Sequence, residues 1–192
     1  MILFLPPAPH TGSFFDVMRV WLPEFEAQAA TYPGYGDEPA VAKPSIESYA
    51  SALLPIAETT HLVGFHTGCL VALEIARREE NIETITLVDV PYFDAATKAK
   101  HRNNLDPENP IHAAFFAAFE YNLDNVLQLC TRTVNVVATN SSLLEPTRRA
   151  AEKLQYARFI EQPDISKPAF EQPAMAELLR SIFLDNSQTP LR

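Results

Sequence analysis

The segment from His61 to Ala76 constrains the fold most, because a short apolar run, a tight turn and a helical apolar pattern follow one another there. Gly64 and Gly68 bracket the three residues of the turn, and His66 lies at its centre. Glycine at both positions allows a strand and a helix to pass closer together than a Cβ atom would permit. We therefore predict a strand that ends in a sharp reversal, places His66 at the edge of a sheet, and continues as a helix.

The remaining sequence alternates short apolar runs with segments whose apolar residues recur at helical spacing. This alternation predicts βαβ units, so we expect an α/β protein built as a three-layer α/β/α sandwich with a mainly parallel sheet of about six strands. Further strands are expected at Ile2–Leu5, Ala27–Tyr32, Ile82–Asp89, Val134–Ala138 and Ala157–Ile160, and helices at Phe14–Leu22, from Ser45, at Ile111–Cys130, from Pro146 and at Ala174–Leu184.

Composition narrows the class of protein. A chain of 192 residues with 47% hydrophobic residues is long enough for a single domain with a sizeable core. The net charge of −9 argues against a nucleic-acid partner or an anionic membrane surface. The N-terminal apolar run is too short for a signal sequence, and no stretch is long enough to span a membrane. We therefore expect a cytoplasmic protein. Cys69 and Cys130 lie in apolar helical patterns, which favours core thiols over a disulfide.

All five glycines follow one of the first three predicted strands. In a parallel sheet these positions lie at the carboxyl edge, where ligands bind. Tight turns alone would also explain these glycines. They support the topology and leave the presence of a ligand site open.

Five segments, taken in order, resemble characteristic segments of the α/β-hydrolase superfamily. The resemblance covers nearly the whole chain and implies the α/β-hydrolase fold in a single domain, residues 1–192, with residues 92–129 as a small helical cap. Relative to the family, the sequence starts at the third strand. The segments are Leu5–Phe14 for the oxyanion loop, Tyr32–Gly36 for the P-G-x-G turn, Gly64–Gly68 for the nucleophile elbow, Val134–Pro146 for the acid loop and Phe159–Pro173 for the catalytic-histidine segment.

The resemblance places a substituted residue at each position of the family's catalytic triad. His66 stands at the nucleophile position, Ser142 at the acid position and Ser166 at the base position. Independently of this alignment, the sequence has no histidine after His112. The histidine that serves as the usual general base therefore cannot come from the loop after the last strand, where this fold places it.

The oxyanion loop is altered as well, because Pro7 stands where the family has glycine and proline has no N–H to donate. The backbone N–H groups of Ala8 and Thr67 remain as donors that could point into the site. Asp89 ends the next strand at the same sheet edge and is the candidate to orient the ring of His66. His10, His66 and Asp89 lack the spacing of a metal site, so we expect no metal and no cofactor.

Three functions are consistent with these residues. The first is a catalytically silent relative of the hydrolases that binds a small, partly apolar molecule in the cleft between elbow and cap, or a protein on the cap. The second is an unconventional esterase-like hydrolase with His66 as nucleophile or water activator and Asp89 as its orienter. The third is a scaffold that forms a homo-oligomer without a ligand. The sequence favours the first and leaves residual catalysis open. The expected pocket residues are Ala8, His10, Phe65, Thr67, Phe115, Phe119, Ser142 and Ser166.

Overall fold

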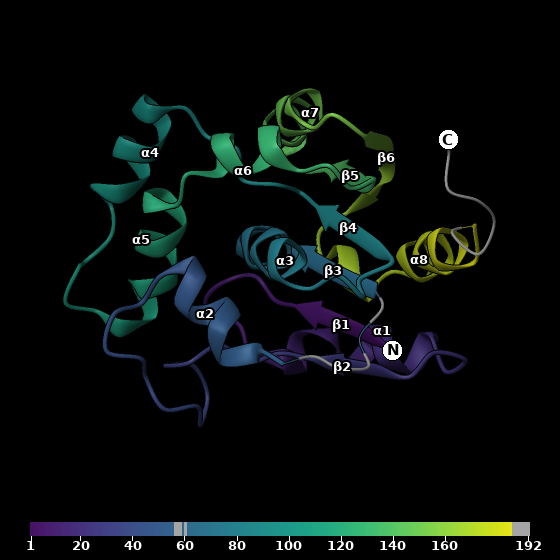
Figure 1. Cartoon of the computed structure of the whole chain (residues 1–192), viewed down its shortest axis with the longest axis horizontal. Coiled ribbons are helices and arrows are strands. Elements are labelled where there is room, and N and C mark those ends of the chain that lie inside the picture. Colours follow the sequence, from purple (N-terminus) through teal and green to yellow (C-terminus); the bar gives the residue numbers. More distant parts are fainter. Residues whose placement is uncertain (56–58, 60, 186–192) are drawn as a thin grey trace.

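The computed structural model describes residues 1–55, 59 and 61–185. One six-stranded sheet runs through the molecule in the order β2-β1-β3-β4-β5-β6 (Figure 1), and every neighbouring pair is parallel. The α/β class and the number of strands are as predicted. The chain runs outward from β1 to β2 and then returns past β1 to β3, so the winding reverses between β1 and β3. The strands are β1 (Ile2–Leu5), β2 (Ala27–Ala29), β3 (His61–Phe65), β4 (Thr84–Val88), β5 (Val134–Asn140) and β6 (Ala157–Ser166).

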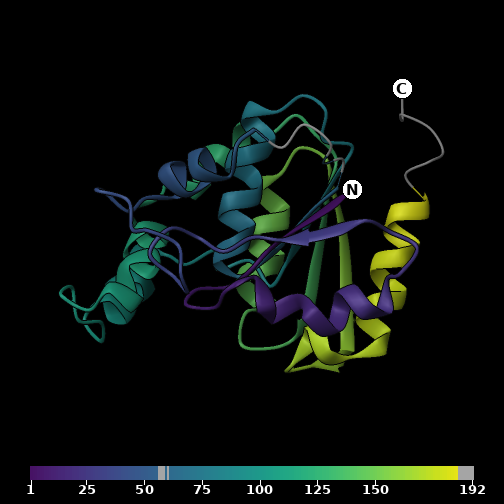
Figure 2. The ribbon, with the colours of Figure 1, turned by 90° about the horizontal axis from the view of Figure 1, so that it is seen from below.

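Helices cover both faces of the sheet and complete the three layers. One buried cluster joins the sheet to α2, α3 and α7, with α5 and α6 packed outside them, and a second cluster joins the opposite face to α1 and α8 (Figure 2). The helices are α1 (Asp16–Trp21), α2 (Ile46–Leu53), α3 (Thr67–Arg78), α4 (Ala95–Arg102), α5 (Ala113–Glu120), α6 (Leu123–Leu129), α7 (Leu144–Lys153) and α8 (Pro173–Asp185), with 3₁₀ turns η1 (Gly12–Phe15), η2 (Pro110–His112) and η3 (Ala169–Glu171).

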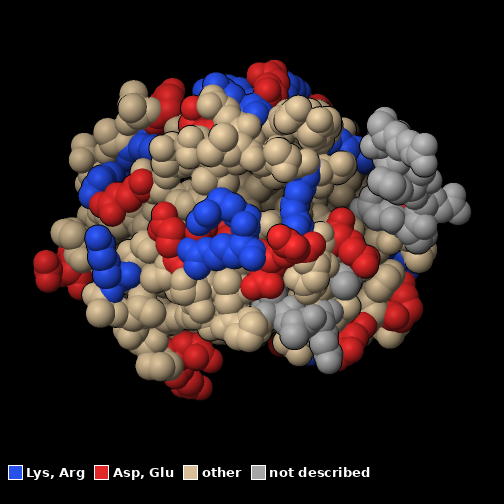
Figure 3. All heavy atoms as spheres, viewed as in Figure 1, with Lys and Arg blue, Asp and Glu red and all other residues tan. Residues whose placement is uncertain are grey.

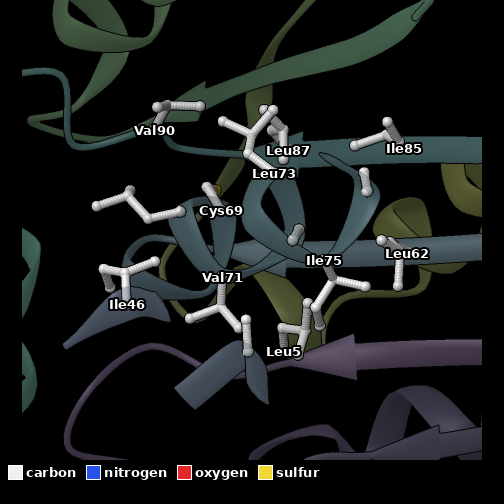
Figure 4. Close-up of a cluster of buried hydrophobic side chains, with 14 of the residues drawn as sticks. Leu5, Ile46, Leu62, Cys69, Val71, Leu73, Ile75, Ile85, Leu87 and Val90 are labelled. Carbon is white, nitrogen blue, oxygen red and sulfur yellow. The ribbon is translucent and has the colours of Figure 1, made fainter. Parts of the chain in front are cut away.

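Helix α3 is the central element of the first cluster, and its residues from Thr67 to Ala76 are all buried. Figure 4 shows its side chains, among them Val71 and Ile75, between residues of the neighbouring strands and Ile46 of α2. A helix that is apolar around most of its circumference must be covered on several sides. The sheet, α2, α5 and α6 supply that cover, and the start of α3 is therefore held firmly against the carboxyl edge of the sheet.

The prediction of one long helix over Ile111–Cys130 is wrong. The structure has η2, α5 and α6 in this segment, and Tyr121 between α5 and α6 is extended (φ −65°, ψ 132°). The side chain of Asn122 caps α6 by accepting a hydrogen bond from the backbone N–H of Asn125 (3.3 Å). The break turns the hydroxyl of Tyr121 toward α3, where it donates to the carboxylate of Glu74 (3.0 Å).

A second tyrosine ties the same segment to the turn after β2. The hydroxyl of Tyr35 donates to the backbone oxygen of Ile111 (3.1 Å) and accepts from the backbone N–H of Ala114 (3.0 Å). Together with the bond from Tyr121 to Glu74, these contacts fix both ends of α5. Among the helices in the described residues, none combines the length and apolar character that crossing a membrane requires.

Candidate functional site

The turn between β3 and α3 has the sharp reversal that the two glycines predict. His66 has φ 49° and ψ −114°, a conformation that costs most residues of order 1–3 kcal/mol. Its backbone N–H donates to the oxygen of Val88 (3.1 Å), and its carbonyl accepts from the N–H of Cys69 (2.9 Å). Histidine is one of the few non-glycine residues enriched at positive φ. The turn therefore presents an imidazole at the carboxyl edge of β3.

Close backbone approach explains both glycines. A Cβ atom added to Gly64 would lie 2.5 Å from the carbonyl oxygen of Gly68, and one added to Gly68 would lie 2.0 Å from the carbonyl oxygen of Leu5. Both distances are far below van der Waals contact with rigid backbone. The sequence spacing thus reflects a real steric requirement at the site.

Aromatic rings line the turn on one side. The rings of Phe65 and His66 are 4.0 Å apart between centroids, and Phe65 also contacts Phe14 (5.7 Å) and Phe170 (5.0 Å). The exposed ring of His10 lies 4.9 Å from Phe14. We call Phe14, Phe65 and Phe170 the aromatic wall. Phe14 and Phe170 were not among the predicted site residues, although both lie in segments that the resemblance to the superfamily had singled out.

The imidazole of His66 is neutral at pH 7. Burial lowers its pKa to about 4, the negative charge of Asp89 opposes this shift, and Lys167 and His10 add to it. Nε2 of His66 is buried and has no hydrogen-bond partner. Lys167 was not predicted as a site residue. It follows Ser166 directly, so the same alignment would have pointed to it.

Asp89 does not hydrogen-bond to His66. Its own backbone has positive φ (52°), and its buried carboxylate accepts from the backbone N–H (2.8 Å) and the hydroxyl (2.6 Å) of Thr139, at the end of β5. Both carboxylate oxygens therefore have partners in the neighbouring strand. The structure brings Asp89 close enough to His66 to affect its pKa, but it does not form the orienting contact that the sequence suggested.

The other predicted site residues divide between the turn and more distant positions. Ala8 and Thr67 are buried, at the loop after β1 and at the start of α3. Ser142 and Ser166 are both exposed, and Ser166 pairs with Asn140 across β5 and β6.

Phe115 and Phe119, expected as the roof of the pocket, are half-buried. Their rings contact His112 (6.4 Å) and His101 (6.3 Å), respectively. Within the described part of the chain, no cluster of three His, Cys, Asp or Glu side chains is arranged to hold a metal ion.

Two pockets lie on the surface of the described part of the chain away from the turn, and His66 lines neither of them. One, of about 370 Å³, lies between the end of α3 and the end of α6. The other, of about 660 Å³, lies between Pro44 and the α4–α5 segment, where Arg102 pairs with Glu120 (2.8 Å). The ring of His66 is half-buried at the turn.

No protein-family model matches the sequence, and no curated protein is detectably similar to it. Solved structures, in contrast, match over most of the chain. An esterase from Exiguobacterium antarcticum superposes with a TM-score of 0.74 at 15% identity, covering 94% of this chain and 90% of the esterase. A lipase-esterase related protein from Clostridium acetobutylicum gives 0.72 at 14% identity over 94% and 93%. An alpha/beta hydrolase from Sphaerobacter thermophilus gives 0.69 at 14% identity over 93% and 91%.

Proposed function

We propose that this protein, which has the α/β-hydrolase fold, binds a small, partly apolar molecule at the turn before α3 without hydrolysing it. One observation carries the proposal. The nucleophile position holds a neutral imidazole whose Nε2 is buried and unpaired, while the nearby carboxylate of Asp89 is bound by Thr139. The turn holds an unsatisfied polar atom, and no acid–base pair is assembled beside it.

Conventional acyl transfer needs a nucleophile and a base within hydrogen-bond reach. The turn supplies no hydroxyl at its centre, and the sequence contains no histidine beyond His112 to act as the base. A pKa of about 4 makes His66 a weak base at pH 7, where an efficient general base has a pKa near the working pH. Removing members of a triad costs several orders of magnitude in rate.

Binding is supported by three features of the same place. The side chain of His66 does not cap α3, so the N–H groups of Thr67 and Gly68 at its start receive no side-chain cap from this residue. These groups and the helix dipole suit an acceptor oxygen of a ligand. Phe14, the partly exposed member of the aromatic wall, suits an apolar part. An unpaired buried nitrogen, which folded proteins rarely contain, suits a further hydrogen bond.

The first test measures hydrolysis of a panel of p-nitrophenyl esters by the wild-type protein, His66→Ala and His101→Ala. His101 is exposed and far along the chain from the turn, so its substitution is the matched control. We expect the three proteins to give the same background rate. Turnover that disappears in His66→Ala and persists in His101→Ala would instead establish the esterase-like alternative. In that case the carboxylate of Asp89 must give up its hydrogen bonds from Thr139 and accept one from His66.

The second test measures binding of acetanilide, an uncharged aromatic amide that supplies one carbonyl oxygen, by amide chemical shifts in NMR. We expect shifts at Phe65 and Thr67 that saturate, and weaker binding to His66→Ala than to His101→Ala. If no compound of this kind shifts the turn and the protein instead forms a stable homo-oligomer, the scaffold hypothesis replaces this proposal.

A further inference from the structure

The pocket of about 370 Å³ lies at the opposite end of α3 from His66. Since α3 has 12 residues and a helix rises 1.5 Å per residue, the two places are separated by roughly 18 Å. A ligand at the turn does not reach this pocket, so it is a separate site. We call it the α3–α6 pocket; it is lined by Leu73, Ala76, Arg77, Glu79, Glu80, Val126, Leu129, Cys130, Thr131 and Arg132.

Hydrogen bonds hold the wall of the α3–α6 pocket in place. The guanidinium of Arg132 donates to the backbone oxygens of Ile82 (2.8 Å), Glu79 (2.9 Å) and Glu80 (3.1 Å), beyond the end of α3. These contacts pair carbonyl groups of the loop that follows α3 and hold that loop in place. Pockets whose walls are fixed before binding lose less conformational entropy when a ligand binds.

The second arginine of the α3–α6 pocket is also engaged. Arg77 forms two hydrogen bonds to the buried carboxylate of Glu74 (2.7 and 3.1 Å), which Arg78 and Tyr121 also contact. Figure 3 shows basic and acidic side chains side by side at the centre of this face, over α3. The arginine donors are thus largely used within the protein.

The charges of the pocket lining cancel, because two arginines face two glutamates. Glu79 and Glu80 form no ion pair within the described residues, so their carboxylates remain available as hydrogen-bond acceptors. The floor and rim are apolar and include the buried Leu73 and the largely exposed Leu129. Desolvating an anionic ligand there would cost free energy that no unpaired positive charge returns, because both arginines are engaged within the protein.

We infer that the α3–α6 pocket binds an uncharged, mainly apolar small molecule that carries a hydroxyl group. The apolar body lies on Leu73, Val126 and Leu129, and the hydroxyl donates to Glu79 or Glu80. The volume is within the range of small-molecule sites, which extends from about 300 to about 1,000 Å³. This inference is independent of the function proposed for the turn, since no residue is shared.

The test compares 4-phenylbutan-1-ol with 4-phenylbutanoate and 4-phenylbutylamine, which share an apolar body and differ in charge. Binding is followed by NMR shifts of the amides at residues 129–132 and by the rate at which iodoacetamide alkylates Cys130. Cys130 is half-buried in the pocket, whereas Cys69 is fully buried and serves as the internal reference. We expect the alcohol to bind at least about fivefold more tightly than the carboxylate and to slow alkylation of Cys130. Tighter binding of the amine or the carboxylate, or no effect of the alcohol at millimolar concentration, would overturn the inference.

Two variants locate the site. Leu129→Ser removes an apolar rim residue that is 69% exposed, and should weaken binding of the alcohol about threefold without disturbing the fold. Val20→Ser, at an apolar residue of α1 that is 73% exposed, is the matched control and should bind as the wild type does. Ala76→Leu fills the pocket and should abolish binding. If Ala76→Leu does not fold, the affinities of Leu129→Ser and Val20→Ser for the alcohol still test the site. Equal affinities of these two variants would refute it.

Discussion

Acidification from pH 7 to pH 5 should destabilise this protein through His66. Its pKa is about 4 in the folded protein, against 6.5 for an unperturbed histidine. Because the folded pKa is the lower one, the unfolded chain binds a proton between these values that the folded protein does not bind. Stability therefore falls as the pH decreases through the window from 6.5 to about 4, and this contribution is constant below it.

The magnitude follows from the size of the shift. A difference of one pKa unit corresponds to about 1.4 kcal/mol, so the full effect amounts to about 3 kcal/mol. Between pH 7 and pH 5 the linkage relation gives a loss of about 2 kcal/mol. The pKa is lowered by burial of the ring and raised in part by the charge of Asp89. This loss of stability should therefore be absent from a variant in which His66 is replaced by a residue that does not titrate.

Urea denaturation measures the effect, followed by the fluorescence of the single tryptophan, Trp21, which packs against the second buried cluster. His66→Asn is the informative variant because asparagine also tolerates positive φ and does not titrate in this range. Carboxylates that titrate in both proteins contribute equally to the pH dependence, so their contribution cancels in the difference in unfolding free energy between wild type and variant. An unchanged difference between pH 7 and pH 5, or an NMR titration of His66 with a pKa near 6.5, would refute the assigned burial of this ring.

Four further variants test the structure elsewhere. Gly68→Ala should destabilise the protein by at least about 3 kcal/mol, because the new Cβ meets the carbonyl oxygen of Leu5 at 2.0 Å. Gly34→Ala should cost only about 1–2 kcal/mol, because its Cβ meets only Ala40, at 3.6 Å, and the cost comes from the positive φ of 87°. Tyr121→Phe removes a donor to a carboxylate and should cost about 1.5–3 kcal/mol. Ser45→Ala removes the capping box of α2 and should cost about 1 kcal/mol. Urea denaturation measures all four variants.

Each of these expectations has an outcome that would contradict it. Equal costs for the two glycine variants would mean that β1 and α3 are farther apart than described. A Tyr121→Phe effect that stays the same in a Glu74→Gln background would mean that the hydroxyl does not depend on that carboxylate. A negligible cost for Ser45→Ala would show that α2 begins elsewhere or is held by packing alone.

The resemblance of sequence segments located the fold correctly but described some elements incompletely. Strand β6 was expected to end at Ile160 and extends to Ser166, where it pairs with Asn140 after an irregularity in the register. Polar residues and Pro163 in this strand concealed its length, because it is an edge strand with mostly exposed side chains. The break at Tyr121 was concealed by an apolar pattern that continues through α5 and α6.

The sequence by itself determined the strand, turn and helix around His66, because the glycine spacing is a local steric requirement that few other conformations satisfy. It also determined the parallel sheet, since alternating strands and helices leave few other topologies. Only the tertiary structure decided that Asp89 pairs with Thr139 and that Lys167 lies near His66. Residues far apart in the chain make these contacts, and their geometry depends on how strands and loops pack together. The hydrogen bonds and charges around His66 therefore depend on tertiary packing, whereas the backbone conformation of the turn depends on the residues of the turn itself.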